Sequence, residues 1–177
     1  MLRYRDASST PGCAEISTAE ILSHLNRHLF RNSSSERYAT FFLGVYDAET
    51  RQLIYTNAGH LPPVYIFNGA VKKLETGGTV VGLFNDVPYE QGSVQMEPGG
   101  VLVAYSDGLI EPENVYGEEF GPDRLTSAAL RVCNSTPSEI AGALIQAVEE
   151  WSGTPEQADD MTVIVSRFSA APPEVRA

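Results

Sequence analysis

Two short acidic turns are the parts of this chain best suited to chemistry. The first, residues 105–108, contains Asp107 and Gly108, and the second, residues 158–162, contains Asp159 and Asp160. Each turn adjoins an apolar run of β type, so each places a carboxylate at a strand end. Carboxylate oxygens are ligands that Mg²⁺ and Mn²⁺ prefer. Two carboxylates about 4 Å apart would repel by roughly 4 kcal/mol at an effective dielectric near 20, so a shared cation or a proton must relieve them if they meet.

Each acidic turn also has a purely structural interpretation. Asp-Gly is favoured in hairpin turns that need a positive φ, so Asp107 and Gly108 fit a turn as well as a ligand site. Against a hairpin, the following residues include Pro112 and the polar stretch 113–119, which make a poor returning strand. For Asp159 and Asp160 the alternative is a solvated loop end, which fits less well with the abrupt start of a buried-type strand. The residues alone leave ligand and turn open for Asp107.

Composition limits the classes of function. With 177 residues and 42% hydrophobic content, the chain can bury a core and suits one domain. A net charge of −11 argues against non-specific binding to nucleic acid or anionic membrane. Cys13 and Cys133 form no CxxC motif, so neither a disulfide framework nor a zinc cluster is expected. No apolar run approaches the ~20 residues that cross a bilayer, and we expect a soluble protein of the reducing cytoplasm.

Helix signals occur at three places. Ser17 begins a capping-box pattern, Thr136 begins a second one with proline at the first helical position, and Gly153 is suited to end that helix. A shorter helix is predicted for residues 120–130. His24 and His28 lie four residues apart on the first helix, a spacing that can chelate a metal. Without the glutamate of an HExxH motif, we interpret both as surface residues.

Strand signals occur between and after the helices. Predicted hairpins join 39–46 to 51–56 and 64–67 to 71–74, the second around Asn68-Gly69. Further strands are predicted at 92–96, 101–105 and 161–168. The glycine-rich residues 76–79 lack the lysine and spacing of a phosphate-binding loop and are interpreted as a turn. This order of elements predicts an α+β domain with antiparallel sheet and helices packed outside.

Six motifs then follow one another at compatible spacing: RYATFF (37–42), NAGHLPP (57–63), GLF (82–84), PGG (98–100), YSDGLIE (105–111) and DDMT (159–162). Taken in order, they resemble a PPM-type (PP2C-like) serine/threonine phosphatase of the SpoIIE/RsbU branch. Any one of these motifs would be a weak signal by itself. The resemblance spans residues 17–168, and it favours Asp107 as a ligand.

The resemblance implies an antiparallel β-sandwich flanked by helices and a centre of two Mn²⁺ or Mg²⁺ ions. These ions activate water for direct attack on phosphoserine or phosphothreonine, without a phosphoenzyme. Carried over by motif, Asp107 is a metal ligand and Gly108 permits close backbone approach. Asp159 best matches the other late acidic ligand, with Asp160 as its neighbouring candidate. His60 is not assigned as a general acid, because its motif could equally orient a strand end through hydrogen bonds.

The chain departs from the family in one respect. The family carries an earlier Asp-x-x-Gly-His-Gly motif that supplies further metal ligands, and nothing before residue 17 resembles it. We therefore expect an N-terminally incomplete domain, with a remnant helix or loop at 1–16, a partial phosphatase domain at 17–168 and a disordered tail at 169–177. Missing early strands would uncover a sheet edge, which predicts pairing into a homodimer.

Two hypotheses of function follow. The first is a metal-dependent phosphatase domain that acts on a phosphorylated regulatory protein, such as an anti-sigma-factor antagonist. The second is a non-catalytic interaction module, or an inactive fragment, that retains the phosphatase fold. The absence of the early ligand motif favours the second, and the two late acidic turns favour the first.

Overall fold

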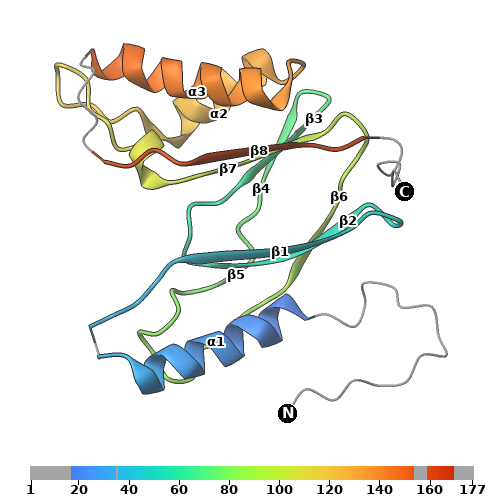
Figure 1. Cartoon of the computed structure of the whole chain (residues 1–177), viewed down its shortest axis with the longest axis vertical. Coiled ribbons are helices and arrows are strands. Elements are labelled where there is room, and N and C mark those ends of the chain that lie inside the picture. Colours follow the sequence, from blue (N-terminus) through green and yellow to red (C-terminus); the bar gives the residue numbers. More distant parts are fainter. Residues whose placement is uncertain (1–16, 35, 154–158, 170–177) are drawn as a thin grey trace, which may run out of the picture. The chain divides into compact units, whose positions relative to one another are not determined.

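The computed structural model describes residues 17–34, 36–153 and 159–169. Its elements form two sheets with flanking helices, the α+β architecture that the sequence predicts (Figure 1). Contacts divide the chain into two compact units, Met1–His60 with Thr76–Gln95 and Leu61–Glu75 with Met96–Ala177. In order, the elements are α1 (Thr18–Asn32), β1 (Phe41–Asp47), β2 (Gln52–Ala58), β3 (Val64–Phe67), β4 (Ala70–Lys73), β5 (Gly77–Gly78), β6 (Gly92–Gln95), β7 (Val101–Tyr105), the 3-10 helix η2 (Asp107–Leu109), α2 (Gly121–Val132), α3 (Pro137–Ser152) and β8 (Val163–Arg167).

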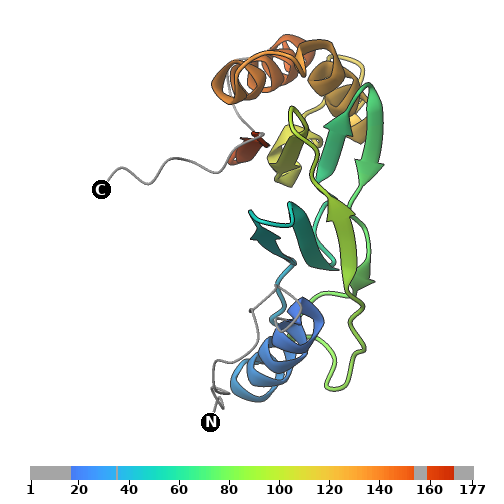
Figure 2. The same cartoon turned by 90° about the vertical axis from the view of Figure 1, so that its right-hand side faces the viewer.

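The first unit contains a sheet of β1, β2, β5 and β6. β1 and β2 form the predicted antiparallel hairpin, β6 pairs antiparallel with β2, and the glycine-rich β5 makes a short parallel pair with β2. Helix α1 begins where predicted, because the Ser17 side chain accepts a hydrogen bond from the Glu20 N–H at 3.2 Å. Its apolar side packs against the sheet unit through Leu22, which is fully buried in a cluster with Ala58. The views agree that α1 lies along this sheet (Figure 2).

The second unit contains the antiparallel sheet β4-β3-β7-β8. Asn68 and Gly69 join β3 to β4 with positive φ values of 49° and 76°, the backbone that a two-residue type I′ hairpin needs. The predicted hairpin is therefore confirmed. Helices α2 and α3 lie together over one side of this sheet (Figures 1 and 2). The core between them includes Val64, Val101, Val103, Leu125, Ile140 and Leu144, all essentially without solvent exposure.

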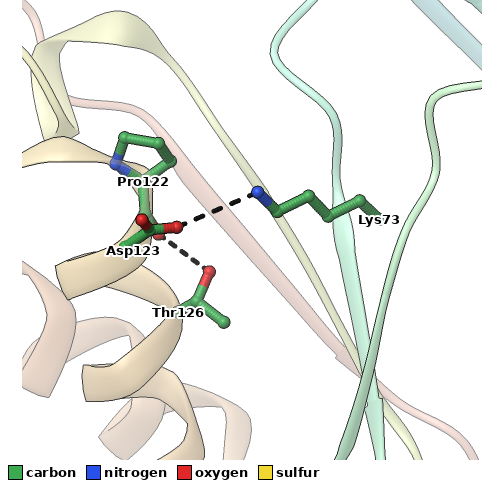
Figure 3. A network of polar contacts seen from close by, with 4 residues as sticks. All are labelled: Lys73, Pro122, Asp123 and Thr126. Atoms are coloured by element: carbon green, nitrogen blue, oxygen red, sulfur yellow. Dashed lines mark hydrogen bonds and ion pairs between the residues drawn. The ribbon is translucent and has the colours of Figure 1, made fainter.

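The ends of α3 follow the sequence signals closely. Thr136 and Glu139 form the reciprocal capping box, and Gly153 ends the helix in the left-handed region at φ 65°. On α2, the Asp123 carboxylate lies 3.9 Å from Lys73 Nζ on β4, and Thr126 Oγ1 donates to the Pro122 carbonyl (Figure 3). Because the Asp123 side chain is 98% exposed, this ion pair contributes little to stability.

Strand β8 is more exposed to solvent than the sequence indicates. Its apolar, β-branched run indicates a buried strand, but β8 is an outer strand of its sheet within the described residues, and Ile164 is 61% exposed. Val163 and Val165 alternate with Ile164 and are partly buried against the core, as expected for a strand with one packed face. The remnant predicted at 1–16 and the tail beyond Ser169 lie outside the described residues. None of the described helices is long and apolar enough to cross a membrane.

Candidate metal centre at two strand ends

The two acidic turns lie beside each other at one end of the β7–β8 pair. These strands are antiparallel neighbours, with Tyr105 paired to Val163. The ladder continues for one residue beyond the strands, because the Ser106 N–H donates to the Thr162 carbonyl at 3.0 Å. The first acidic turn therefore follows the end of β7, and the second acidic turn precedes the start of β8 at the same end of the strand pair.

After Ser106 the chain enters η2 instead of turning back as a hairpin. The Leu109 N–H donates to the Ser106 carbonyl at 3.1 Å, and the Ile110 N–H donates to the Asp107 carbonyl at 2.8 Å. β7 already pairs with β3 and β8, so Asp107 and Gly108 do not connect it to a returning strand. The hairpin alternative for these two residues is therefore wrong. The Asp107 side chain is exposed, and its Oδ1 accepts from the Gly108 N–H at 3.0 Å.

Gly108 packs closely against the second turn. A Cβ atom at this position would lie 2.4 Å from the carbonyl oxygen of Asp160 and 2.9 Å from its carbonyl carbon. Since no real Cβ tolerates such distances, the observed packing requires glycine. The backbone of Asp160 therefore packs directly against Gly108.

Asp159 and Asp160 differ in their surroundings although both are exposed. The Asp160 N–H donates to Asp159 Oδ1 at 2.7 Å. Asp159 lines an open pocket of about 430 Å³ together with Gly108, Glu111, Pro112 and Glu113, whereas neither Asp107 nor Asp160 belongs to the lining. All charged side chains of this lining are acidic, so the pocket favours cations.

A neighbouring tyrosine adds no negative charge to this end of the sheet near neutral pH. Burial raises the pKa of the Tyr105 hydroxyl, and the negative charge of Asp123 raises it further. Tyr105 therefore stays protonated at neutral pH, and the charge beside β7 comes from the carboxylates.

The residues present fit a divalent cation as a partial ligand set. Carboxylate and backbone carbonyl oxygens are the donors that Mg²⁺ takes, and Mg²⁺ commonly keeps several waters while one or two carboxylates bind it. Over the ranges that the structure describes, no group of three or more His, Cys, Asp or Glu side chains is arranged to hold a metal ion. Asp107 and Asp159 could therefore supply part of a coordination shell, with the remaining positions left to water or other donors.

The histidines of the first unit contact neighbouring residues of their own helix or turn. His24 Nδ1 lies 3.0 Å from Arg27 Nη2, and both His24 and His28 are exposed on α1. Asn57 accepts from the His60 N–H at 2.8 Å and donates to the His60 carbonyl at 2.9 Å. These two bonds close the turn after β2, which favours the interpretation that this motif orients a strand end.

Sequence reasoning missed three residues of the candidate centre. Ser106 links the two turns by its side chain, and Glu111 and Glu113 line the pocket. A glutamate in a polar stretch carries no signal of its own. Only the pairing of β7 with β8 brings Glu111 and Glu113, which follow η2, to the same pocket as Asp159.

Comparison with solved structures defines the class of fold. The SiaA-PP2C domain of Pseudomonas aeruginosa superposes with a TM-score of 0.75 at 22% identity, covering 85% of this chain and 61% of that one. The manganese-presoaked phosphatase domain of SpoIIE from Bacillus subtilis gives a TM-score of 0.66 at 20% identity, covering 95% of this chain and 80% of that one. The fold is therefore PP2C-like.

The chain belongs to the SpoIIE family, described as "Stage II sporulation protein E (SpoIIE)", whose sequence profile matches residues 1–169. Protein IcfG of Synechocystis sp. is 33% identical over 129 residues, covering 72% of this chain and 20% of that protein. The phosphoserine phosphatase RsbU of Bacillus subtilis is 28% identical over 127 residues, covering 71% of this chain and 38% of that protein. The chain thus spans between a fifth and two fifths of the length of these relatives.

Proposed function

We propose that this chain is a metal-dependent protein serine/threonine phosphatase domain that acts on a phosphorylated regulatory protein, such as an anti-sigma-factor antagonist. One observation carries the proposal: in a member of the SpoIIE family, Asp107 and Asp159 stand at adjacent strand ends, and Asp159 and Gly108 line an acidic pocket there. The relative RsbU is named a phosphoserine phosphatase, which supports phosphoserine as the reacting group.

In this proposal the protein's own residues bind the divalent cations and hold the two acidic turns together. Asp107 and Asp159 hold Mn²⁺ or Mg²⁺, with Asp160 as a neighbouring candidate, and Gly108 lets the two turns close together. Bound divalent cations supply Lewis acidity and an activated water for phosphate-ester hydrolysis. Because Glu111, Glu113 and Asp159 surround the pocket with negative charge, we expect a phosphate group to bind only when cations are present.

The first test is the release of phosphate from a phosphoserine protein in the presence and absence of Mn²⁺. We expect Mn²⁺ to stimulate release by the unmodified chain and Asp107→Asn to abolish the stimulation, because it removes a charged ligand. Asp123→Asn is the matched control, since it removes an exposed carboxylate of α2 that belongs to neither acidic turn. Full activity in Asp107→Asn would defeat the assignment.

A non-catalytic interaction module is the second candidate. It is favoured by one observation, namely that the described residues bring no three metal-binding side chains together. Calorimetry separates the two candidates. Uptake of two Mn²⁺ ions supports the phosphatase, whereas binding of a partner protein without any metal uptake supports the module.

Two further parts of the proposal concern assembly and location. A homodimer could form along an exposed sheet edge, because β8 is an outer strand within the described residues and carries the exposed Ile164. A monomer in light scattering across the assay concentrations would contradict this pairing. A cytoplasmic location agrees with the free, partly buried thiol of Cys133, and cell fractionation would test it.

A further inference from the structure

A serine side chain takes the place of a backbone carbonyl where the two acidic turns join. In a hydrogen-bonded antiparallel pair, the two residues normally exchange two backbone bonds. Ser106 makes the first of them, from its N–H to the Thr162 carbonyl at 3.0 Å. The return bond from the Thr162 N–H goes to Ser106 Oγ at 2.9 Å.

The carbonyl of Ser106 is engaged elsewhere because the chain bends at this residue. It accepts the Leu109 N–H at 3.1 Å, the bond that starts η2 and presents Asp107. The hydroxyl therefore completes the last rung of the ladder while the main chain turns away from β8. With alanine at this position, the Thr162 N–H would lose its partner within the protein.

The same hydroxyl also reaches the other side of the second turn. Ser106 Oγ donates to the Asp160 carbonyl at 3.2 Å, so it bonds to both ends of the segment from Asp160 to Thr162. That carbonyl oxygen is the atom that occupies the space beside Gly108. Ser106 holds the Asp160 carbonyl by a hydrogen bond, and Gly108 makes room for it.

We propose that Ser106 is a positioning residue whose hydroxyl fixes the separation of the Asp107 and Asp159 carboxylates. Asp107 follows Ser106 directly, and Asp159 precedes the carbonyl that Ser106 holds, so both carboxylates are tied to one side chain. The catalytic consequence rests on the proposed function, because the carboxylates must share a cation for their separation to matter. The hydrogen-bond link itself stands independently of that function.

The test compares Ser106→Ala with Ser106→Thr. Threonine keeps the hydroxyl and readily adopts the extended backbone of Ser106, at φ −89° and ψ 169°. Ser127→Ala is the matched control, since it removes an exposed serine hydroxyl on α2 outside the acidic pocket lining. All four proteins, including the wild type, are first compared by thermal unfolding to establish that they fold.

Two readouts follow. Without metal, amide hydrogen exchange at Thr162 should rise several-fold in Ser106→Ala, as expected for the loss of one hydrogen bond. In calorimetry, Mn²⁺ affinity should fall by about tenfold in the same variant, the scale seen when the groups that orient metal ligands are removed. Ser106→Thr should restore both values, and Ser127→Ala should change neither.

The outcomes separate this inference from the proposed function. If Ser106→Ala retains wild-type Mn²⁺ affinity, or if Thr162 exchange is unchanged, the positioning role is overturned while the phosphatase proposal stands. If Ser106→Thr folds but behaves like Ser106→Ala, the hydroxyl is not the cause, and the inference fails. If the wild type binds no Mn²⁺ at all, the proposed function fails first, and the positioning role fails with it.

Discussion

At Gly108 the space that a side chain would occupy is filled by the backbone of the neighbouring turn. The Asp160 carbonyl oxygen lies 2.4 Å from the position that a Cβ atom of residue 108 would occupy. The contact is therefore made by backbone atoms of Asp160 and not by a side chain. A flexible side chain could move aside at little cost, but the Asp160 carbonyl belongs to the turn before β8 and cannot move without that turn. A side chain at Gly108 would therefore force the two turns apart.

We predict that Gly108→Ala abolishes Mn²⁺-stimulated phosphatase activity and lowers the free energy of unfolding by about 1–3 kcal/mol, the usual cost of overpacking. Gly142→Ala is the control, because a Cβ at Gly142 on α3 meets nothing within 4 Å. The control should keep full activity and gain up to about 1 kcal/mol, since alanine is the better helix former. Urea unfolding and the phosphate-release assay measure both effects, and an active, stable Gly108→Ala protein would refute the prediction.

Asp107 and Asp159 could be proposed from the sequence because each stands where an apolar run meets a polar turn. Ser106 could not, although it lies next to Asp107. Its hydroxyl bonds to Thr162, which is 56 residues away in the chain, and only the register of β7 against β8 brings the two together. Local sequence shows which side chains can make hydrogen bonds, but the partner depends on long-range pairing.

Among the elements, α3 has the most completely specified start. Its Glu139 carboxylate accepts from the Thr136 N–H and from the Thr136 hydroxyl, both at 2.8 Å. The backbone bond and then the side-chain bond hold the pKa of Glu139 below its usual value of 4.5. A lowered pKa means that the native state favours the ionised carboxylate, so this contribution to stability is present above pH 4.5 and is lost as pH falls through the folded-state value.

We predict that Glu139→Gln flattens part of the acid limb of the stability curve. Glutamine can still bond to the N-cap residue but does not titrate, so the difference in unfolding free energy between wild type and variant should shrink as pH falls below 4.5. Circular dichroism during urea unfolding at a series of pH values measures this difference. A difference that stays constant from pH 6 to pH 3 would contradict the assignment.

Elements with local sequence signals were predicted well, but the strands with which they pair were not. The Asn68-Gly69 turn specifies its hairpin because the required positive φ values depend on those two residues. The strands predicted at 92–96 and 101–105 are separated by a short loop, yet β6 pairs with β2 whereas β7 pairs with β3 and β8. The outer position of β8 likewise follows from pairing between distant segments, which a β-branched run does not reveal.

At the scale of the whole molecule, each of the two compact units has its own sheet and its own buried cluster. Motif order and element order were sufficient to predict the family and the α+β class. They did not show that residues 61–75 belong with the C-terminal half of the chain, because that grouping depends on β3 pairing with β7. The two acidic turns both fall within this second unit, so the candidate centre is assembled by a single sheet.

The net charge of −11 gives the whole chain an affinity for cations that is not specific to any site. A test of metal binding must therefore distinguish a shared site from general attraction. Removing one exposed carboxylate elsewhere, as in Asp123→Asn, makes the net charge less negative by the same amount as removing a ligand. Any effect found only for Asp107 and Asp159 then belongs to the centre.

The measurement that tests the account most directly is a double-mutant cycle of Mn²⁺ binding by calorimetry, with Asp107→Asn, Asp159→Asn and the double variant. If the two carboxylates hold a common cation, each single variant should lose about tenfold or more in affinity, and the double variant should bind little worse than the weaker single one. Wild-type affinity in either single variant, or losses that simply add in the double variant, would contradict a shared cation and with it the proposed phosphatase centre.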